Sequence, residues 1–409
     1  MMQNGFRHLL IGQTCSGIGG AFLIMALMPM LFEKTGSAAA MALVPFLLTG
    51  LRFIGTVLAP ILMVSMPLRS MIVGAESLKA VTLLIVILVG LLVDAQIFLL
   101  VLYGCTALIG LLNGCASPAY RGLLPRLVKE KELMRANSLL ASVSEMIEMA
   151  AWPLGGMAIV MFGTSPLLYV TGILFACGAL VMLFVTPTKV ENQRLRGRQN
   201  VREEVCRGWL YIWHRPVLRR LTGAEGLESA ANVVWIAAIM YVYVSEALGA
   251  SEVWWGYMNA SMLVGLFLAG LYAYGKTEPL QEQSRFFILG SSILIALATG
   301  VLAINSSSIL ALVLIFLFGI GSQLKGVLVA TFIQKWVPEK ELPNVYAAQE
   351  AFGLSVFGCS ALIFGVLIDL LNVRFIFGIA AILMLGATTL MFTILHYFAK
   401  TDSKKDMSL

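Results

Sequence analysis

Val128-Lys-Glu-Lys-Glu-Leu133 and Val337-Pro-Glu-Lys-Glu-Leu342 are two copies of one hexapeptide pattern, Val-x-Glu-Lys-Glu-Leu, in a chain of 409 residues. The copies start 209 positions apart. Each copy follows a long apolar run and precedes another. We therefore interpret the second half of the chain as a diverged copy of the first half.

The composition places this duplicated chain in a membrane. Hydrophobic residues make up 59% of the chain, charged residues only 12%, and the mean hydropathy is +0.89. A soluble domain of this size exposes more surface than so few charges can cover. Met1–Leu10 lacks the apolar core and cleavage site of a secretory signal. Internal duplication within an integral membrane protein is typical of secondary transporters, whose substrate site lies between the repeats.

Apolar runs long enough to cross a bilayer, about 20 residues each, occur six times in each half of the chain. The predicted fold is therefore an all-α membrane protein with twelve transmembrane helices in two six-helix pseudo-symmetric bundles. We expect an N-terminal bundle over 1–186, a cytoplasmic linker over 187–217, a C-terminal bundle over 218–398 and a cytoplasmic tail over 399–409. The predicted spans are 8–31, 38–64, 70–93, 96–118, 137–161, 165–186, 218–245, 251–274, 285–304, 307–331, 343–370 and 374–398.

The distribution of Lys and Arg predicts the orientation of these spans. Twelve spans place both termini on one side, and the loops on the opposite side carry only Lys34 and Arg374. By the positive-inside rule, both termini are expected to be cytoplasmic, in a bacterial inner membrane. The net charge of +6 follows from this bias, so it does not indicate nucleic-acid binding.

The linker between the halves contains a second type of helix. Val201, Val205, Trp209 and Ile212 recur at helical spacing with charged residues between them, and Pro216 ends the pattern. This pattern predicts an amphipathic helix along the inner membrane face. It is interpreted as a structural tether between the bundles, with a lipid-regulated role as the alternative.

Nothing in the chain indicates an enzyme, a cofactor or a metal site. The six cysteines show no metal-ligand spacing, and the three histidines lie near the ends of apolar runs. No phosphate-binding Gly-x-x-x-x-Gly-Lys-Ser/Thr loop is present, which excludes ATP-driven transport by this chain.

Charged residues within the spans are the candidate functional residues, because an ionised side chain in a bilayer needs a partner, a proton or a water-filled cavity. Span 7 places Glu225, Glu228, Asn232 and Trp235 in one stripe at i, i+3, i+7 and i+10. Two carboxylates one turn apart in a medium of low dielectric can bind and release protons near neutral pH. The alternative is that each glutamate is permanently protonated and hydrogen-bonded to a neighbouring helix.

Span 5 carries a similar acidic and aromatic stripe, with Glu145, Glu148 and Trp152 at i, i+3 and i+7. The same two interpretations apply to its glutamates. Glu76 and Lys79 in span 3 are three residues apart on one helical face, where they can neutralise each other. We interpret that pair as structural.

Two basic residues lie deep within predicted spans. The Arg52 guanidinium stays charged near the middle of span 2, so it must face an acid or a substrate anion. Lys325 in span 10 is interpreted as a counter-ion for the glutamates, with contact to a substrate anion as the alternative.

Four local sequences are characteristic of a known family: Ser117-Pro-Ala-Tyr-Arg-Gly-Leu-Leu-Pro-Arg-Leu-Val128, Leu133-Met-Arg-Ala-Asn-Ser-Leu139, Glu204-Val-Cys-Arg-Gly-Trp-Leu-Tyr-Ile-Trp-His-Arg-Pro-Val-Leu-Arg219 and Trp336-Val-Pro-Glu339. They resemble the major facilitator superfamily, and in particular its branch of enterobactin exporters and macrolide-efflux proteins. The resemblance covers the chain from end to end and, together with the two acidic and aromatic stripes, implies a proton-driven exporter.

Two motifs of that superfamily are altered in this chain. The loop between spans 2 and 3, Ala59-Pro-Ile-Leu-Met-Val-Ser-Met-Pro-Leu-Arg69, keeps Arg69 but lacks the usual aspartate. The antiporter motif of span 5 reads Trp152-Pro-Leu-Gly-Gly156, with Trp in place of Gly. Arg121 and Arg126 flank the turn between spans 4 and 5, where they are expected to pair with Glu130 and Glu132, with gating as the alternative.

The resemblance implies that spans 2 and 11 adjoin, which would make Glu350 the acid that pairs with Arg52. It also implies a cavity lined by Asn232, Trp235 and Trp152. The expected function is export of a small amphiphilic molecule, a drug or secondary metabolite, in exchange for protons. The expected partners are that small molecule, protons and the lipid bilayer, with no nucleic acid, and the chain is expected to be a monomer. The alternatives are a siderophore exporter and a lysophospholipid transporter.

Overall fold

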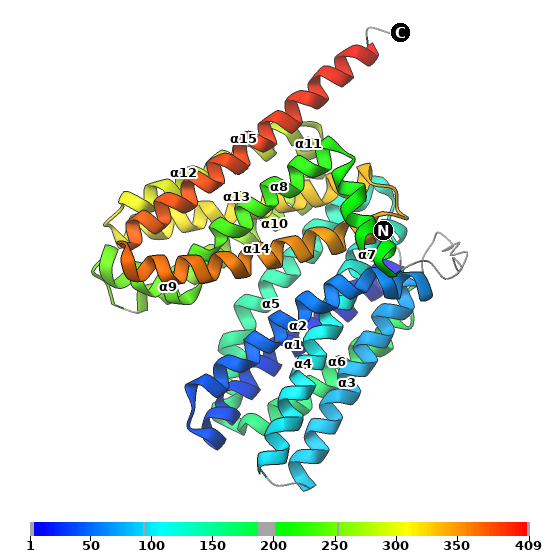
Figure 1. Cartoon of the computed structure of the whole chain (residues 1–409), viewed down its shortest axis with the longest axis vertical. Helices are drawn as coiled ribbons and strands as arrows, with labels where there is room; N and C mark the ends of the chain where they lie inside the picture. Colours follow the sequence, from blue (N-terminus) through cyan, green and yellow to red (C-terminus); the bar gives the residue numbers. More distant parts are fainter. Residues whose placement is uncertain (1–3, 93–94, 187–200, 252, 407–409) are drawn as a thin grey trace. The chain divides into compact units, whose positions relative to one another are not determined.

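The computed structural model describes residues 4–92, 95–186, 201–251 and 253–406, and this part of the chain is helical without β-strands (Figure 1). Eleven of its helices are long and apolar enough to cross a membrane. A twelfth crossing is completed if the bent pair Pro216–Trp235 and Ile239–Ala247 forms one span. The predicted all-α membrane fold is confirmed.

The helices of the first half follow the six predicted spans closely. Short 3₁₀ turns at Leu124–Arg126 and Glu130–Glu132 separate the fourth and fifth helices, at the first copy of the repeated hexapeptide. The six helices are α1 (Asn4–Thr35), α2 (Ala38–Ser65), α3 (Leu68–Leu92), α4 (Ala95–Leu123), α5 (Leu133–Phe162) and α6 (Thr164–Met182).

The second half follows the other six predicted spans, except that its first span is broken. The last helix continues into the predicted tail, of which 407–409 lie outside the described residues. The helices are α8 (Pro216–Ala231), α9 (Ala237–Val242), α10 (Val253–Gly275), α11 (Thr277–Glu282), α12 (Ser284–Ile304), α13 (Ser308–Trp336), α14 (Leu342–Leu370) and α15 (Val373–Asp406).

Glycines set the close approach of the second and fourth helices in each half. A Cβ atom at Gly114 of α4 would lie 2.8 Å from the backbone nitrogen of Thr56 in α2. A Cβ atom at Gly319 of α13 would similarly lie 2.5 Å from the backbone oxygen of Met262 in α10. Only residues without a side chain allow helices to pack at this distance. The two halves therefore share a packing device at corresponding helix pairs, as a duplication predicts.

The chain forms two compact units that exchange short segments between its halves. The first unit contains Met1–Leu133, Met146–Trp209 and Gln334–Ala351. The second contains Met134–Glu145, Leu210–Ile333 and Phe352–Leu409. The predicted bundle boundaries follow the sequence repeat. The compact units differ from them, because the end of α13 and the start of α14 belong to the first unit.

The predicted amphipathic linker helix is present as α7 (Val201–Trp213), while 187–200 lie outside the described residues. Arg207 of α7 donates from Nε to Oε2 of Glu341 at 2.8 Å. A Cβ atom at Gly208 would meet the carbonyl group of Asn344. These contacts attach α7 to the start of α14 within the first unit, and the role of α7 as a tether between the bundles stays a prediction.

Candidate functional site

The seventh span is interrupted at the position of the predicted acidic and aromatic stripe. Its first helix, α8, ends at Ala231, and Asn232–Trp235 form a 3₁₀ turn. Ile236 then adopts an extended conformation with ψ 139° before α9 begins. The two parts of the span are bent by 55°. The expectation of one continuous stripe from Glu225 to Trp235 was therefore wrong beyond Ala231.

No sequence signal marks this break. The segment Asn232-Val-Val-Trp-Ile236 contains neither Pro nor Gly, and its apolar residues suit a continuous span. Discontinuous helices are a common element of transporter binding sites, because their ends expose backbone dipoles within the membrane. The break therefore makes Asn232–Ile236 a stronger candidate site than the sequence pattern alone did.

Trp235 lies at this break with its ring held by two aromatic neighbours. Its ring centroid is 4.3 Å from that of Phe318 and 6.2 Å, edge on, from that of Phe377. The indole Nε1 is buried and makes no hydrogen bond to any described residue. A buried donor without a partner costs about 1–3 kcal/mol. This N–H group is therefore suited to a ligand that brings an acceptor. The Asn232 side chain is exposed.

The span 7 glutamates share one buried lysine. Lys325 of α13 is 5% exposed, and its Nζ donates to Oε1 of Glu228. Glu225, one turn earlier on α8, also interacts with the Lys325 charge. The interpretation of Lys325 as a counter-ion is thus confirmed. The single positive charge of Lys325 thus lies close to two carboxyl groups, one of which accepts a hydrogen bond from it.

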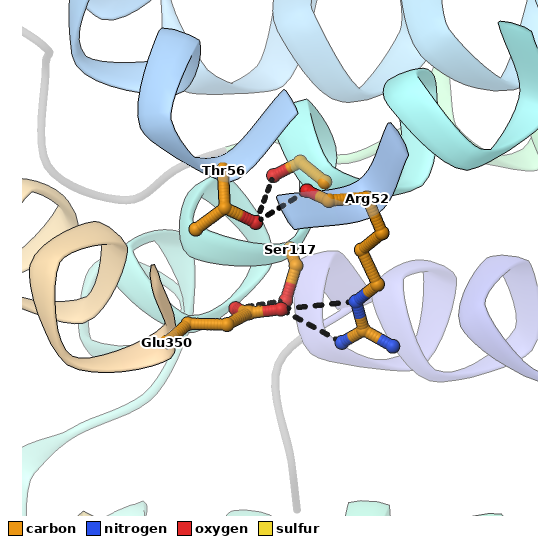
Figure 2. Close-up of polar contacts among 5 residues, drawn as sticks. Arg52, Thr56, Ser117 and Glu350 are labelled. Carbon is orange, nitrogen blue, oxygen red and sulfur yellow. Dashed lines mark hydrogen bonds and ion pairs between the residues drawn. The ribbon is translucent and has the colours of Figure 1, made fainter. Parts of the chain in front are cut away.

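A second polar site lies in the first unit, around Arg52 of α2 (Figure 2). The Nε and Nη2 of Arg52 donate to Oε1 of Glu350 at 3.1 and 2.8 Å. The hydroxyl group of Ser117 in α4 donates to Oε2 of the same carboxylate at 2.6 Å. The predicted pairing of Arg52 with Glu350 is confirmed. The contribution of Ser117 was missed, although the residue stands in the motif that identified span 4.

The helix backbone beside Arg52 is fixed by a threonine. The Thr56 hydroxyl donates to the Arg52 carbonyl at 2.9 Å and approaches the Gly114 carbonyl at 3.3 Å (Figure 2). The Glu350 side chain is 7% exposed, whereas that of Arg52 is 44% exposed. Nη1 of Arg52 makes no hydrogen bond to a described residue, so this half-exposed guanidinium can accept a further anionic group.

The span 5 glutamates lie one turn apart on α5, where the division between the two compact units falls. Glu145 is partly buried and belongs to the second unit, whereas Glu148 is exposed and belongs to the first. The side chain of Trp152 lies outside the described residues. The roles predicted for these three residues stay predictions.

The three arginines predicted as gating or loop residues all contact other elements of the first unit. Arg69 donates to the carbonyl of Leu183, next to the end of α6. Arg121 lies over the ring of Tyr346 at 5.5 Å, and Arg126 donates to the carbonyl of Glu339 at 3.3 Å. The last two contacts reach the segment Gln334–Ala351, at the second copy of the repeated hexapeptide.

The family model described as Major Facilitator Superfamily matches residues 9–322. The chain belongs to this superfamily. An uncharacterized MFS-type transporter of Bacillus subtilis (strain 168), YfmI, is 25% identical over 401 residues, which cover 98% of this chain and 99% of the relative. A second such transporter of the same organism, YjbB, is 23% identical and covers 92% of this chain and 91% of the relative.

Solved structures of superfamily members share the fold at low sequence identity. A bacterial homologue of the iron transporter ferroportin in an outward-facing state has a TM-score of 0.76 at 16% identity, covering 95% of this chain and 99% of that one. The structure of the human organic anion transporter MFSD10 has a TM-score of 0.76 at 10% identity, covering 95% of this chain and 99% of that one. The structure of the Escherichia coli fucose:proton symporter has a TM-score of 0.72 at 13% identity, covering 96% of this chain and 98% of that one. As a member of the superfamily, the chain is a multi-pass transporter of the secondary type.

Proposed function

We propose that this transporter exports a small amphiphilic molecule in exchange for protons, with Glu225, Glu228 and Lys325 as the proton-coupling group. The observation that supports this function most is the buried Lys325 paired with Glu228 and facing Glu225 beside the broken span. Two acids that share one base can exchange a proton without leaving a lysine uncompensated in a medium of low dielectric.

The proton and the substrate would act on the same short piece of chain. Glu228 lies one turn before the end of α8, and the break that follows carries Asn232 and Trp235. A proton on Glu228 weakens its pairing with Lys325 and so changes the electrostatic field at the end of α8. Substrate binding at the break and proton binding at Glu228 then influence each other, as exchange requires.

The chemistry around the break suits an amphiphile. The rings of Phe318 and Phe377 supply an apolar surface, and the unpartnered Nε1–H of Trp235 supplies one donor. Small-molecule sites combine apolar and aromatic side chains with a few placed polar groups. We propose Asn232 and Trp235 of the second unit as substrate-binding residues at this break. Trp152, Glu145, Glu148, Arg52 and Glu350 are proposed as further substrate or coupling residues, each on its own element.

The test is export by the double variant Glu225→Gln/Glu228→Gln in a bacterial strain that lacks its own efflux pumps. Resistance to ethidium and erythromycin is measured together with the amount of the protein in the membrane. Loss of wild-type resistance at unchanged protein level is expected. Glu278→Gln, an exposed residue of α11 in the same half, is the matched control. Full resistance in the double variant would exclude these glutamates from proton coupling.

A second candidate function is export of an anionic siderophore. Arg52 favours it, because its guanidinium is 44% exposed within α2 and its Nη1 is not engaged by a described residue. Two solved structures of the same fold are named for organic anions and for iron. A deletion strain that secretes less catecholate siderophore under iron limitation would support this substrate. Unchanged siderophore secretion together with increased ethidium sensitivity would support the first.

Lysophospholipid transport is the third alternative, and its dependence on energy separates it from the other two. Collapse of the proton gradient should abolish exchange with protons and leave lipid flipping unchanged. We also propose that both termini are cytoplasmic, that the membrane is the bacterial inner membrane, and that the transporter acts as a monomer. A reporter fused to each terminus tests the orientation.

A further inference from the structure

A buried cluster of charged and polar residues lies in the first unit, apart from the residues discussed above. Glu76 and Lys79 of α3 are 0% and 1% exposed, and Nζ of Lys79 lies 2.7 Å from Oε1 of Glu76. Their predicted mutual neutralisation is confirmed. A buried ion pair generally stabilises a fold no better than apolar residues of similar size. Its presence therefore calls for an explanation other than stability.

Lys79 is surrounded as a permanently charged ammonium would be. Its Nζ donates to Glu76 Oε1, to Ser16 Oγ at 2.8 Å and to Asn113 Oδ1 at 3.1 Å, which uses all three of its N–H groups. The ring of Phe175 lies 4.9 Å from the same nitrogen. These three acceptors match the three N–H groups of a charged ammonium, so the geometry favours Lys79 as the cation of the cluster.

Glu76 is surrounded asymmetrically. Its Oε1 accepts hydrogen bonds from Lys79, from Ser16 at 3.0 Å and from Tyr120 at 3.0 Å. Its Oε2 is buried and has no hydrogen-bond partner among the described residues. An ionised carboxylate oxygen without a hydrogen-bond donor is unfavourable in the interior, and a proton bound to it removes the negative charge.

Gly178 of α6 borders both Oε2 and a backbone carbonyl group. A Cβ atom at Gly178 would lie 3.3 Å from the Gly12 carbonyl oxygen, 3.7 Å from Glu76 Oε2 and 3.8 Å from Cys15 Cβ. The Gly12 carbonyl oxygen is therefore an acceptor on the side of Gly178 that Oε2 also borders.

We propose that Glu76 is a second proton-binding group of this transporter, loaded on Oε2, with Lys79 as its fixed counter-charge. The ionised cluster is neutral overall but leaves Oε2 without a donor, whereas the loaded cluster has a proton on Oε2 and one net positive charge. Each state has one unfavourable feature, so a small change in the surroundings can shift the balance between them. Its role in transport rests on the proton exchange proposed above.

The helices that hold the cluster provide such a change. Ser16 of α1 and Tyr120 of α4 donate to Oε1, and each bond favours the ionised carboxylate. Movement of α1 or α4 that breaks either bond would therefore favour proton binding on Oε2. The other ionisable groups facing Glu76 among the described residues are Lys79 and Cys15, with Cys177 of α6 next to Cys15.

The test is infrared spectroscopy of the full-length purified transporter in lipid vesicles over a range of pH. A carboxylic-acid C=O band that titrates with pH is expected in the wild type and in Glu225→Gln/Glu228→Gln. The band assigned to Glu76 should be absent from Glu76→Gln. In Tyr120→Phe, which keeps the ring but removes a donor to the carboxylate, the same band should persist to higher pH than in the wild type.

Two outcomes would overturn the assignment. One is a set of bands that is unchanged by Glu76→Gln, which would mean that Glu76 stays ionised throughout. The second outcome is used if Glu76→Gln does not fold. In that case, infrared bands of Tyr120→Phe that titrate as in the wild type would contradict proton binding at Glu76. If export depends on the proton gradient and the infrared spectra contain no Glu76 band, only the proposed proton site at Glu76 is refuted. A Glu76 band without proton-dependent export would refute the proposed function and leave the proton site in place.

Discussion

Arg52 and Glu350 are 298 positions apart in the sequence, and Nη2 of the first lies 2.8 Å from Oε1 of the second. The two side chains are not equally protected, because Glu350 is 7% exposed and Arg52 is 44% exposed. Removing either partner therefore has different consequences. A buried carboxylate without its cation is costly, whereas water can solvate a half-exposed guanidinium.

We expect Arg52→Gln to lower the free energy of unfolding by about 2 kcal/mol and Glu350→Gln by less than half as much. The midpoint of thermal unfolding in detergent, followed by tryptophan fluorescence, measures both. The double variant should recover part of the loss caused by Arg52→Gln. Equal losses in the two single variants would show that burial of Glu350 does not determine the effect.

Lys325 and Glu228 should be energetically coupled. Lys325→Met leaves Glu228 without its cation, so a marked decrease in the unfolding midpoint is expected, and Lys325→Met/Glu228→Gln should restore much of it. The coupling energy from this double-mutant cycle should be about 1–3 kcal/mol. The double variant is nevertheless expected to remain inactive in proton-driven export. Additive effects of the two substitutions would contradict the pairing.

Trp235→Phe separates the packing of the indole ring from its hydrogen bond. Phenylalanine keeps an aromatic ring beside Phe318 but removes the buried unpartnered N–H group. Stability should be unchanged or higher by about 1 kcal/mol, because no native hydrogen bond is lost. Export of a substrate that accepts from Nε1 should fall, as shown by the concentration needed for half-maximal transport. Unaltered transport kinetics would indicate that the substrate does not use this group.

Gly114→Ala tests the close contact of α2 and α4. The added methyl group would approach the backbone of Arg52 and Thr56, so the helices must separate, at a cost of about 1–3 kcal/mol. Gly104→Ala in the same helix is the control, since a Cβ atom there has nothing within 4 Å. Thermal unfolding should distinguish the two variants clearly. Similar stability of both variants would mean that the contact of α2 and α4 tolerates an added methyl group.

Much of the fold could be predicted because the periodic and compositional signals of membrane spans are strong. The spans, the linker helix and the partner of Arg52 were all predicted. The break after Ala231 was not, because Asn232-Val-Val-Trp-Ile236 has no helix-breaking residue and its geometry depends on tertiary packing. Ser117, Ser16 and Tyr120 were also missed as carboxylate partners. Their hydroxyl groups give no sequence signal until the helices are placed together.

The assignment of Gln334–Ala351 to the first unit has a consequence for how the protein is made. During synthesis, α1 to α4 enter the membrane long before this segment leaves the ribosome. The contacts of Arg52, Ser117 and Arg126 with this segment therefore form only after the second half of the chain has been synthesised. A ribosome-bound chain that ends at the linker would hold six inserted helices whose folding is still incomplete. The first half of the chain would thus be more accessible to quality-control proteases at this stage than it is in the finished transporter.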